Sequence, residues 1–228
     1  MSAVIVWSDI GCPWAHVAVA RLHRFCAALG LKDVQLDHRA FPLELVNGRP
    51  TPKQILDAEI PVTSELEPGA GWQPWQGEAF EWPVTMLPAL EAVQAVKATQ
   101  GLAASAALDR ALRTALFAHS RCVSLLPVVL DVAHETAGVD VDDLEASLSR
   151  GLGRTAVIDQ WKAATAEGSV IKGSPHLFFP DGRDAHNPGI RMHWDGEHGS
   201  GVPVIESDEP SEYEKLLACF KPARSLSR

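Results

Sequence analysis

The chain has 228 residues, of which 46% are hydrophobic, so it is long and apolar enough to fold around a substantial core. Its formal net charge of −9 argues against polyanionic partners, such as nucleic acid or an anionic membrane surface. No apolar segment approaches the roughly 20 residues that span a bilayer, and the first residues lack the features of an export signal. We therefore expect a cytoplasmic protein with neither a membrane nor a nucleic-acid partner.

Two short strands and the helix between them form the predicted opening unit. Residues 3–7 (AVIVW) are a β-branched apolar run, and residues 34–41 (VQLDHRAF) alternate apolar and polar side chains as strands do. Between them, apolar residues from Pro13 to Leu29 recur at helical spacing until Gly30 ends the pattern. A strand–helix–strand unit of this length predicts two parallel strands.

The middle of the chain is predicted to be mostly helical. Residues 41–83 are rich in proline, glycine and tryptophan, which predicts irregular structure with a helical turn or two around Lys53–Glu59. A series of segments with helical spacing follows between about Leu87 and Glu167, with Ser124 and Asp140 as candidate N-caps. These segments predict a helical block.

The last part of the chain returns to strand patterns. Residues 173–182 (GSPHLFFPDG) and 202–206 (VPVIE) predict strands, and residues 210–220 predict an amphipathic helix. The element order therefore predicts an α/β fold whose core is interrupted by a large helical insertion. We assign residues 1–45 and 168–228 to the core and residues 46–167 to the insertion.

A histidine-rich stretch, residues 184–198, raises the question of a metal site. Its histidines and carboxylates match no short-spacing ligand pattern, and the run is rich in glycine. We therefore predict a solvated loop and no metal. The residues that raise the question are Asp184, His186, His193, Asp195 and His198.

The candidate reactive residue is Cys12, in the stretch SDIGCPWAHVA at residues 8–18. It directly precedes the first predicted helix, where Pro13 takes the first helical position at no cost in hydrogen bonding. Free N–H groups and the helix dipole at this end favour a thiolate, so we expect the pKa of Cys12 to lie below its usual value of about 8.5. A buried structural cysteine is the alternative interpretation.

This stretch resembles the DsbA-like branch of the thioredoxin-fold superfamily, in particular the FrnE-like thiol oxidoreductases. Their pattern is an aspartate, two residues, then Cys-Pro-Trp-Cys, which Asp9, Cys12, Pro13 and Trp14 match. Related proteins are the 2-hydroxychromene-2-carboxylate isomerases and the kappa-class glutathione transferases. The resemblance covers most of the chain and implies a thioredoxin-like core with a large helical insertion that acts as a lid.

A second match lies at residues 173–176 (GSPH), which follow the helical block and precede a strand. There the superfamily places a cis-proline loop beside the active cysteine. The resemblance implies that Pro175 is the cis-proline that shapes the substrate site. It also implies that the backbone of Ser174 pairs with an extended thiol substrate.

One position departs from the redox pattern, because Ala15 stands where a dithiol enzyme has its second cysteine. Cys26 cannot replace it, since it lies about 21 Å further along the same predicted helix and a disulfide needs Cα atoms within about 7 Å. Cys122 and Cys219 cannot be placed from the sequence. In the isomerase and kappa-class pattern, Ser-Pro stands where Cys12 and Pro13 stand, and glutathione supplies the thiol.

Three functions follow. The first, which we prefer, is a DsbA/FrnE-like oxidoreductase in which Cys12 alone attacks a disulfide and forms a mixed disulfide with a low-molecular-weight thiol or a protein, and an external thiol resolves it. The second is a glutathione-dependent isomerase or transferase acting on an aromatic electrophile. The third is a non-catalytic binding protein on the same fold. No bound cofactor is expected beyond glutathione or another low-molecular-weight thiol, and the number of associated chains stays open, a homodimer included.

Three neighbours of Cys12 are candidate site residues. His16 stands four residues later, so a helix would place both on one face, where a protonated imidazole would stabilise the thiolate. A packing role for His16 is the alternative. Trp14 is expected to line the site entrance, and Asp9 is either a buried proton acceptor or a loop cap.

Overall fold

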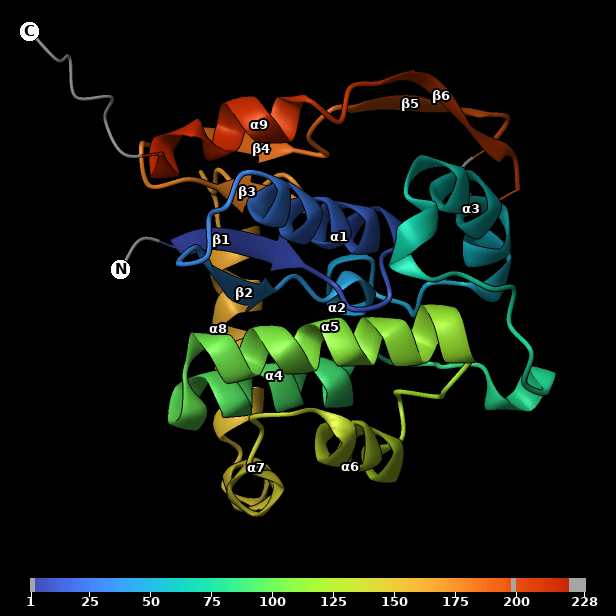
Figure 1. The fold of residues 1–228 in the computed structure, drawn as a ribbon. Coiled ribbons are helices and arrows are strands. Elements are labelled where there is room, and N and C mark those ends of the chain that lie inside the picture. Colours follow the sequence, from blue (N-terminus) through green and yellow to red (C-terminus); the bar gives the residue numbers. More distant parts are fainter. Residues whose placement is uncertain (1–2, 198–199, 222–228) are drawn as a thin grey trace, which may run out of the picture.

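The structure is a computed structural model that describes residues 3–197 and 200–221 (Figure 1). Its main sheet has the strand order β2-β1-β3-β4. Strand β1 (Ala3–Ser8) pairs in parallel with β2 (Gln35–Ala40), which confirms the predicted parallel pair. On its other side β1 pairs antiparallel with β3 (His176–Phe178), which pairs antiparallel with β4 (Asp184–His186).

Helices cover both faces of this sheet because side chains alternate along the strands. Val4 and Val6 of β1 pack against α1 (Pro13–Ala28) and α9 (Glu212–Leu217), which the short helix η3 (Ala218–Phe220) follows. Trp7, on the opposite face of β1, packs with Ala164 of the helical block. The sheet is therefore buried on both sides, as the apolar run of residues 3–7 predicts.

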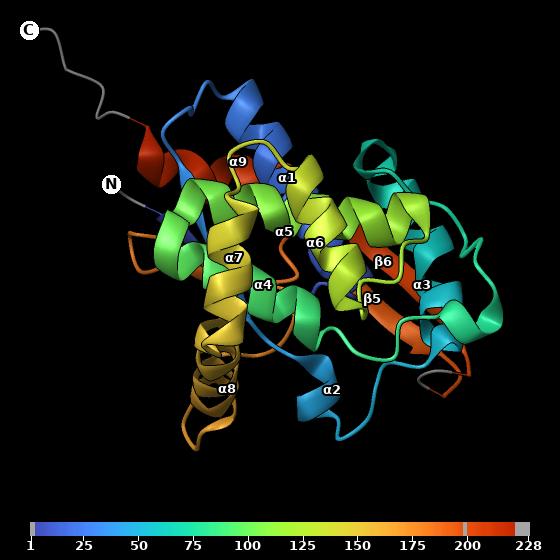
Figure 2. The ribbon, with the colours of Figure 1, turned by 90° about the horizontal axis from the view of Figure 1, so that it is seen from below.

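The helical block lies on the side of the sheet away from α9, as Figures 1 and 2 show. Its helices are α4 (Leu87–Gln100), α5 (Leu102–His119), α6 (Leu126–Glu135), α7 (Val141–Ser149) and α8 (Leu152–Thr165). Helices α4 and α8 pack closely because Gly153 has no side chain: a Cβ there would lie 2.0 Å from the carbonyl oxygen of Glu91. The predicted helical block is confirmed.

The two predicted N-caps of this block differ. Asp140 accepts a hydrogen bond from the Asp143 N–H at 3.1 Å and caps α7 as expected. The prediction for Ser124 is wrong, since α6 starts one residue later with Leu125 at the N-cap. The Ser124 hydroxyl instead bonds both backbone groups of Thr85 and fixes the segment that enters α4.

The segment predicted to be irregular contains a full helix, α3 (Lys53–Leu66), flanked by α2 (Leu43–Val46) and the short helices η1 (Pro68–Ala70) and η2 (Ala79–Glu81). Pro61 lies inside α3 and obscures its helical pattern in the sequence. The helix persists because its buried face, which includes Ile55, Leu56 and Ile60, packs into the main hydrophobic cluster. That apolar contact offsets the backbone hydrogen bond lost at Pro61.

The histidine-rich stretch is largely β-structure, which corrects the predicted loop. It contains β4 and then β5 (Ile190–Asp195), which pairs antiparallel with β6 (Val202–Asp208) in a separate two-stranded sheet. Apolar and polar residues alternate along β5, and its Ile190 and Met192 pack beside Cys12. Within the described ranges no group of three or more His, Cys, Asp or Glu residues could hold a metal ion, and His198 lies outside those ranges.

The largest hydrophobic cluster belongs mainly to the helical block and α3, and it also includes Ile10 and Ala40 of the core. The division of the chain at residues 45 and 168 stays a prediction. None of the helices within the described residues is long and apolar enough to span a bilayer.

Candidate active site

Cys12 lies at the N-cap of α1, where the chain leaves β1 and turns into the helix. Its backbone is extended, with φ −88° and ψ 114°, and Pro13 begins the helix. The Sγ–H of Cys12 donates to the backbone carbonyl of Ser174 at 3.3 Å, and the Ser174–Pro175 peptide bond is cis. The structure thus brings together the two segments on which the resemblance rests.

Asp9 caps the loop that carries Cys12. Its two carboxylate oxygens accept the backbone N–H groups of Gly11, at 2.7 Å, and of Leu43, at 2.8 Å. The Asp9 N–H in turn donates to the Ser174 hydroxyl at 2.9 Å. Burial raises the pKa of Asp9 to about 6, although these N–H bonds and the nearby Arg113 oppose the shift. Both oxygens are occupied, so the loop-cap role fits better than a proton acceptor.

Arg113 of α5 is a residue that the sequence analysis missed. Its fully buried guanidinium donates to the carbonyl of Asp9 at 2.9 Å and to the Ser8 hydroxyl at 2.8 Å, and it pairs with Asp109 at 2.7 Å. It therefore joins the helical block to the loop before Cys12. The sequence signal was an Asp–Arg pair four residues apart among the apolar residues of a helix, where charges are rarely buried unless paired.

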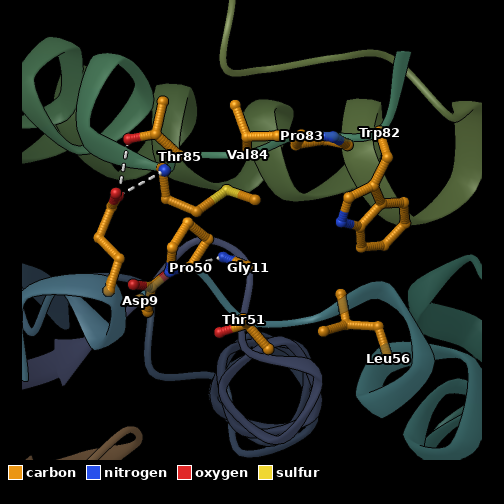
Figure 3. Close-up of a pocket in the computed structure, with 11 residues that line it drawn as sticks. Asp9, Gly11, Pro50, Thr51, Leu56, Trp82, Pro83, Val84 and Thr85 are labelled. Carbon is orange, nitrogen blue, oxygen red and sulfur yellow. Dashed lines mark hydrogen bonds between the residues drawn. The ribbon is translucent and has the colours of Figure 1, made fainter. Parts of the chain in front are cut away.

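Behind this loop lies a cavity of about 20 Å³, enough for roughly one water molecule (Figure 3). In Figure 3, Asp9, Gly11 and Pro50 face the segment from Trp82 to Thr85 across it. The segment is held by Glu44, whose carboxylate accepts bonds from the Thr85 hydroxyl and the Met86 N–H. The cavity therefore lies behind the loop that carries Cys12, and it is too small for a substrate.

A pocket of about 650 Å³ opens beside Cys12, within the range of small-molecule sites. We call it the Cys12 pocket. It is walled by the start of α1, the segment from α2 to α3, the cis-proline loop and the β5–β6 hairpin. Its lining residues include Trp14, Arg49, Glu59, Ser174, Asn187, Met192 and Trp194. The mixture of aromatic, apolar and polar groups suits a small ligand with both apolar and charged parts.

The Cys12 thiol is protonated in this environment, contrary to the expectation from its place at the helix start. Only 4% of the residue is exposed, and burial raises the pKa of the thiol to about 12, with the negative charges of Glu59 and Asp9 adding to the rise. The side chain of Ser174 and the backbone N–H of Ala15 lower the pKa, but their effect is smaller than that of burial. Loss of solvation therefore outweighs the helix N-terminus.

Glu59 is a second residue that the sequence analysis missed. It lies on α3 and is only 7% exposed, and its Oε1 accepts a hydrogen bond from the indole N–H of Trp14 at 2.8 Å. Burial raises the pKa of Glu59 to about 7, although the bond from Trp14 lowers it. Trp14 lines the pocket as expected but is itself buried. The sequence signal that could have revealed it is its spacing of four residues from Ile55 and from Thr63, which places Glu59 on the buried face of α3.

His16 lies apart from Cys12, which corrects the expectation of a shared face. It lines a different pocket of about 360 Å³, which we call the His16 pocket, between α1, η1 and α5. Its ring stacks on Phe117 and meets Trp72 edge-on, and its Nε2–H donates to the carbonyl of Ala70 at 3.2 Å. Burial and the charge of Arg113 lower the pKa of His16 to about 4, so the imidazole is neutral and serves packing.

The other three cysteines do not reach the pocket. In the described part of the chain, Cys26, Cys122 and Cys219 are free thiols like Cys12, and none of them lines the Cys12 pocket. Cys26 and Cys219 pack instead at the edge of the cluster between the sheet, α1 and α9. No second thiol is therefore placed to resolve a mixed disulfide at Cys12 within this part of the chain.

Comparison with solved structures shows the same fold in several other proteins. The cytosolic disulfide reductase DsbM from Pseudomonas aeruginosa aligns with TM-score 0.61 and 18% identity, over 80% of this chain and 87% of DsbM. DsbM solved with GSH aligns with TM-score 0.60 and 16% identity, over 80% and 88%. A 2-hydroxychromene-2-carboxylate isomerase aligns with TM-score 0.58 and 18% identity, over 80% and 87%.

A probable DsbA oxidoreductase from Streptomyces coelicolor aligns with TM-score 0.59 and 21% identity, over 81% of this chain and 83% of that protein. No curated protein sequence matches the chain. The model of the DSBA-like thioredoxin domain matches residues 3–197, which include Cys12, the helical block and the cis-proline loop. The fold predicted from the sequence is confirmed, and the chain belongs to the DSBA-like thioredoxin domain family.

Proposed function

We propose that the protein is a cytoplasmic enzyme that catalyses thiol–disulfide exchange on small-molecule disulfides, with Cys12 as its single nucleophile. The observation that carries this proposal is the contact between the Cys12 thiol and the Ser174 carbonyl, next to a cis-proline and beside a pocket of small-molecule size. This arrangement leaves the sulfur facing the space in which a substrate disulfide would lie, with the Ser174 backbone available to pair with it.

The reaction needs only one protein sulfur. The Cys12 thiolate attacks one sulfur of the substrate disulfide, forms a mixed disulfide and releases the other sulfur as a thiol. A second small thiol then attacks the mixed disulfide and regenerates Cys12. The reductase DsbM, which has been solved with GSH, supports glutathione as that external thiol.

The shape and charge of the pocket support a small, anionic substrate. Cys12 is buried, so a disulfide on a folded protein surface would not reach it, whereas a flexible small molecule would. Arg49 is the one basic residue among the described residues that line the pocket, and it forms no ion pair with any of them. It would attract a carboxylate of a substrate such as oxidised glutathione.

Turnover of oxidised glutathione with an external thiol tests the proposal. The wild-type protein should accelerate the exchange, and Cys12→Ser should reduce the rate to that of the uncatalysed reaction. Cys122→Ser serves as the control, since Cys122 lies outside the pocket, and should keep the wild-type rate. Equal activity in wild-type and Cys12→Ser protein would refute the assignment of the nucleophile.

A glutathione-dependent isomerase or transferase is the second candidate. It is favoured by one observation: the Cys12 thiol is protonated and acts as a hydrogen-bond donor, as a serine hydroxyl would at this position. The aromatic side chains Trp14 and Trp194 in the pocket suit an aromatic electrophile. Glutathione-dependent conversion of such a compound that survives Cys12→Ser would favour this function over disulfide exchange.

A further inference from the structure

Glu59 lines the Cys12 pocket, and one of its two carboxylate oxygens has no hydrogen-bond partner among the described residues. Its Oε1 is fixed by the Trp14 indole, whereas Oε2 accepts no hydrogen bond within the described part of the chain. The residue lines the same pocket as Cys12 and, after burial, its charge is the largest influence on the Cys12 thiol. A buried carboxylate with one free oxygen beside a nucleophilic sulfur is positioned to exchange a proton with whatever thiol occupies the pocket.

The charge balance of the site favours a proton-accepting role for this oxygen. If Cys12 lost its proton to solvent while Glu59 stayed ionised, two negative charges would share a poorly solvated pocket. If the proton moved instead to Glu59, the site would keep a single negative charge throughout. Burial raises the pKa of Glu59 to about 7, so near neutral pH this carboxyl can both accept and return a proton.

We propose that Glu59 is the proton-transfer residue of this site, which takes the proton from the attacking thiol and delivers it to the departing thiolate. The inference rests on the proposed function and adds to it a residue from α3, outside the Cys-Pro-Trp-Ala motif. It follows that the substrates best served are aliphatic disulfides, whose thiolates are strong bases and leave poorly without a proton.

The electron and proton balance closes with the substrate disulfide as oxidant. The Cys12 proton passes to Glu59, and the Cys12 sulfur attacks the substrate disulfide, forming one S–S bond and breaking another. The departing thiolate takes the proton from Glu59 and leaves as a thiol. An external thiol then gives its proton to Glu59 and attacks the substrate sulfur of the mixed disulfide, and the released Cys12 thiolate recovers that proton.

The other acidic and basic candidates near Cys12 do not offer this path. Both carboxylate oxygens of Asp9 accept backbone N–H bonds, and the residue holds the loop. His16 lines the other pocket and donates to Ala70. Of these three residues, Glu59 is the one that lines the Cys12 pocket and keeps a polar atom without a described hydrogen-bond partner.

The test compares two disulfides that differ in their leaving thiol. Reduced enzyme is mixed with dithiobis(nitrobenzoate), whose aromatic thiolate leaves without a proton, or with bis(hydroxyethyl) disulfide, whose aliphatic thiolate needs one. Formation of the mixed disulfide at Cys12 is followed by rapid quenching and mass spectrometry. The variants are Glu59→Gln, which keeps an oxygen for Trp14, and Glu65→Gln on the exposed face of α3 as the matched control.

Glu59→Gln should lose about 100-fold in rate with the aliphatic disulfide, the size of a general acid–base contribution, and less than about threefold with the aromatic one. Glu65→Gln should match the wild type with both. An equal loss with the two disulfides, or none, would overturn the role of Glu59 while leaving the proposed function intact. If the wild type reacts with neither, the proposed function itself fails.

Trp14→Phe gives a second, independent readout. The wild-type rate with the aliphatic disulfide should rise with pH to about 7 and then level off, as Glu59 becomes ionised and able to accept a proton. The bond from Trp14 lowers the pKa of Glu59, so its removal should shift the inflection to higher pH, and Glu59→Gln should abolish it. An inflection unchanged in both variants contradicts the proposal.

Discussion

The two pockets beside α1 differ in the state of their polar groups. The Cys12 pocket holds a protonated sulfur and a carboxylate with a free oxygen, and its shape is set by elements from both the core and the insertion. The His16 pocket is lined by more basic side chains, yet His16 is neutral and hydrogen-bonded and Arg113 is fully paired. No described residue lines both. Glu59 thus keeps one carboxylate oxygen unpaired, whereas His16 and Arg113 are bonded within the protein; in the His16 pocket the Nε2 of His23 is a buried ring nitrogen with no partner among the described residues.

The separation of Cys12 from His16 has a simple geometric cause. Residues four apart lie on one face only when both belong to the helix. Cys12 is the N-cap and has an extended backbone, so its side chain turns toward the cis-proline loop, whereas His16 follows the helical surface toward α5. The same loop geometry buries the thiol, which is why its pKa rises although it stands at a helix start.

The largest expected effect is a difference in disulfide-exchange rate between a variant of the Cys12 pocket and a variant of the His16 pocket. Cys12→Ala should lower the rate of disulfide exchange by at least about 1,000-fold, because no other sulfur lines the pocket. His16→Phe, which keeps the stacking on Phe117, should leave the rate within about threefold. Steady-state rates with oxidised glutathione measure both. A loss in His16→Phe as large as that in Cys12→Ala would remove the distinction between the pockets.

The next effect concerns stability on the His16 side. The pKa of His16 is lowered to about 4 by burial, so the unfolded chain binds more protons than the folded one between pH 4 and 6.5. The stability that His16 contributes is present above pH 6.5 and is lost as the pH falls to 4, by about 3 kcal/mol.

Urea unfolding of wild-type and His16→Phe protein across this pH range measures the loss. The curve for His16→Phe should be flatter by that amount. His38, whose pKa burial also lowers to about 4, contributes equally to both proteins and cancels in the comparison. Parallel curves for the two proteins would mean that His16 is not buried as described.

Asp9, on the Cys12 side, should show the opposite sign. Its pKa is raised to about 6 by burial, so the folded chain binds more protons than the unfolded one between about pH 4 and 6. Asp9 therefore lowers stability as the pH rises through this range, by somewhat less than 3 kcal/mol. Asp9→Asn should gain stability with pH more steeply than the wild type, in the same unfolding experiment. A shallower gain would contradict the description of the Cys12 loop.

The smallest effect tests substrate charge. Arg49 lines the Cys12 pocket and Arg110 lines the His16 pocket, and both are exposed. Arg49→Gln should raise the KM for oxidised glutathione about three- to tenfold, the scale of an exposed charge pair, with little change for uncharged bis(hydroxyethyl) disulfide. Arg110→Gln should change neither value. A larger rise in KM from Arg110→Gln than from Arg49→Gln would mean that the substrate binds in the His16 pocket and not in the Cys12 pocket.

Much of the fold could be predicted because it depends on local patterns and one motif. The parallel strands, the five helices of the block and the place of Pro175 beside Cys12 follow from periodicity and from the resemblance. The full length of helix α3 was not predicted because Pro61 interrupts its helical pattern. Strand β5 was not predicted because its alternation lies in a stretch rich in glycine and histidine.

The electrostatics of the site could not be predicted in the same way. The raised pKa of Cys12 comes first from burial and then from the charge of Glu59, which lies on α3, a helix that the sequence pattern had not resolved. The buried Arg113 that holds the Cys12 loop is likewise brought in by tertiary packing. The local sequence thus indicates a candidate nucleophile, and the folded chain determines the protonation state of its thiol.

The most direct test of the account is to find where a small disulfide attaches to the protein. Reduced wild-type protein is incubated briefly with oxidised glutathione, trapped by acid and digested, and the adduct is located among the four cysteines by mass spectrometry. We expect one glutathione per chain, on Cys12, and none on the Cys12→Ser protein. A rapid adduct on Cys26, Cys122 or Cys219 with Cys12 unmodified would contradict it.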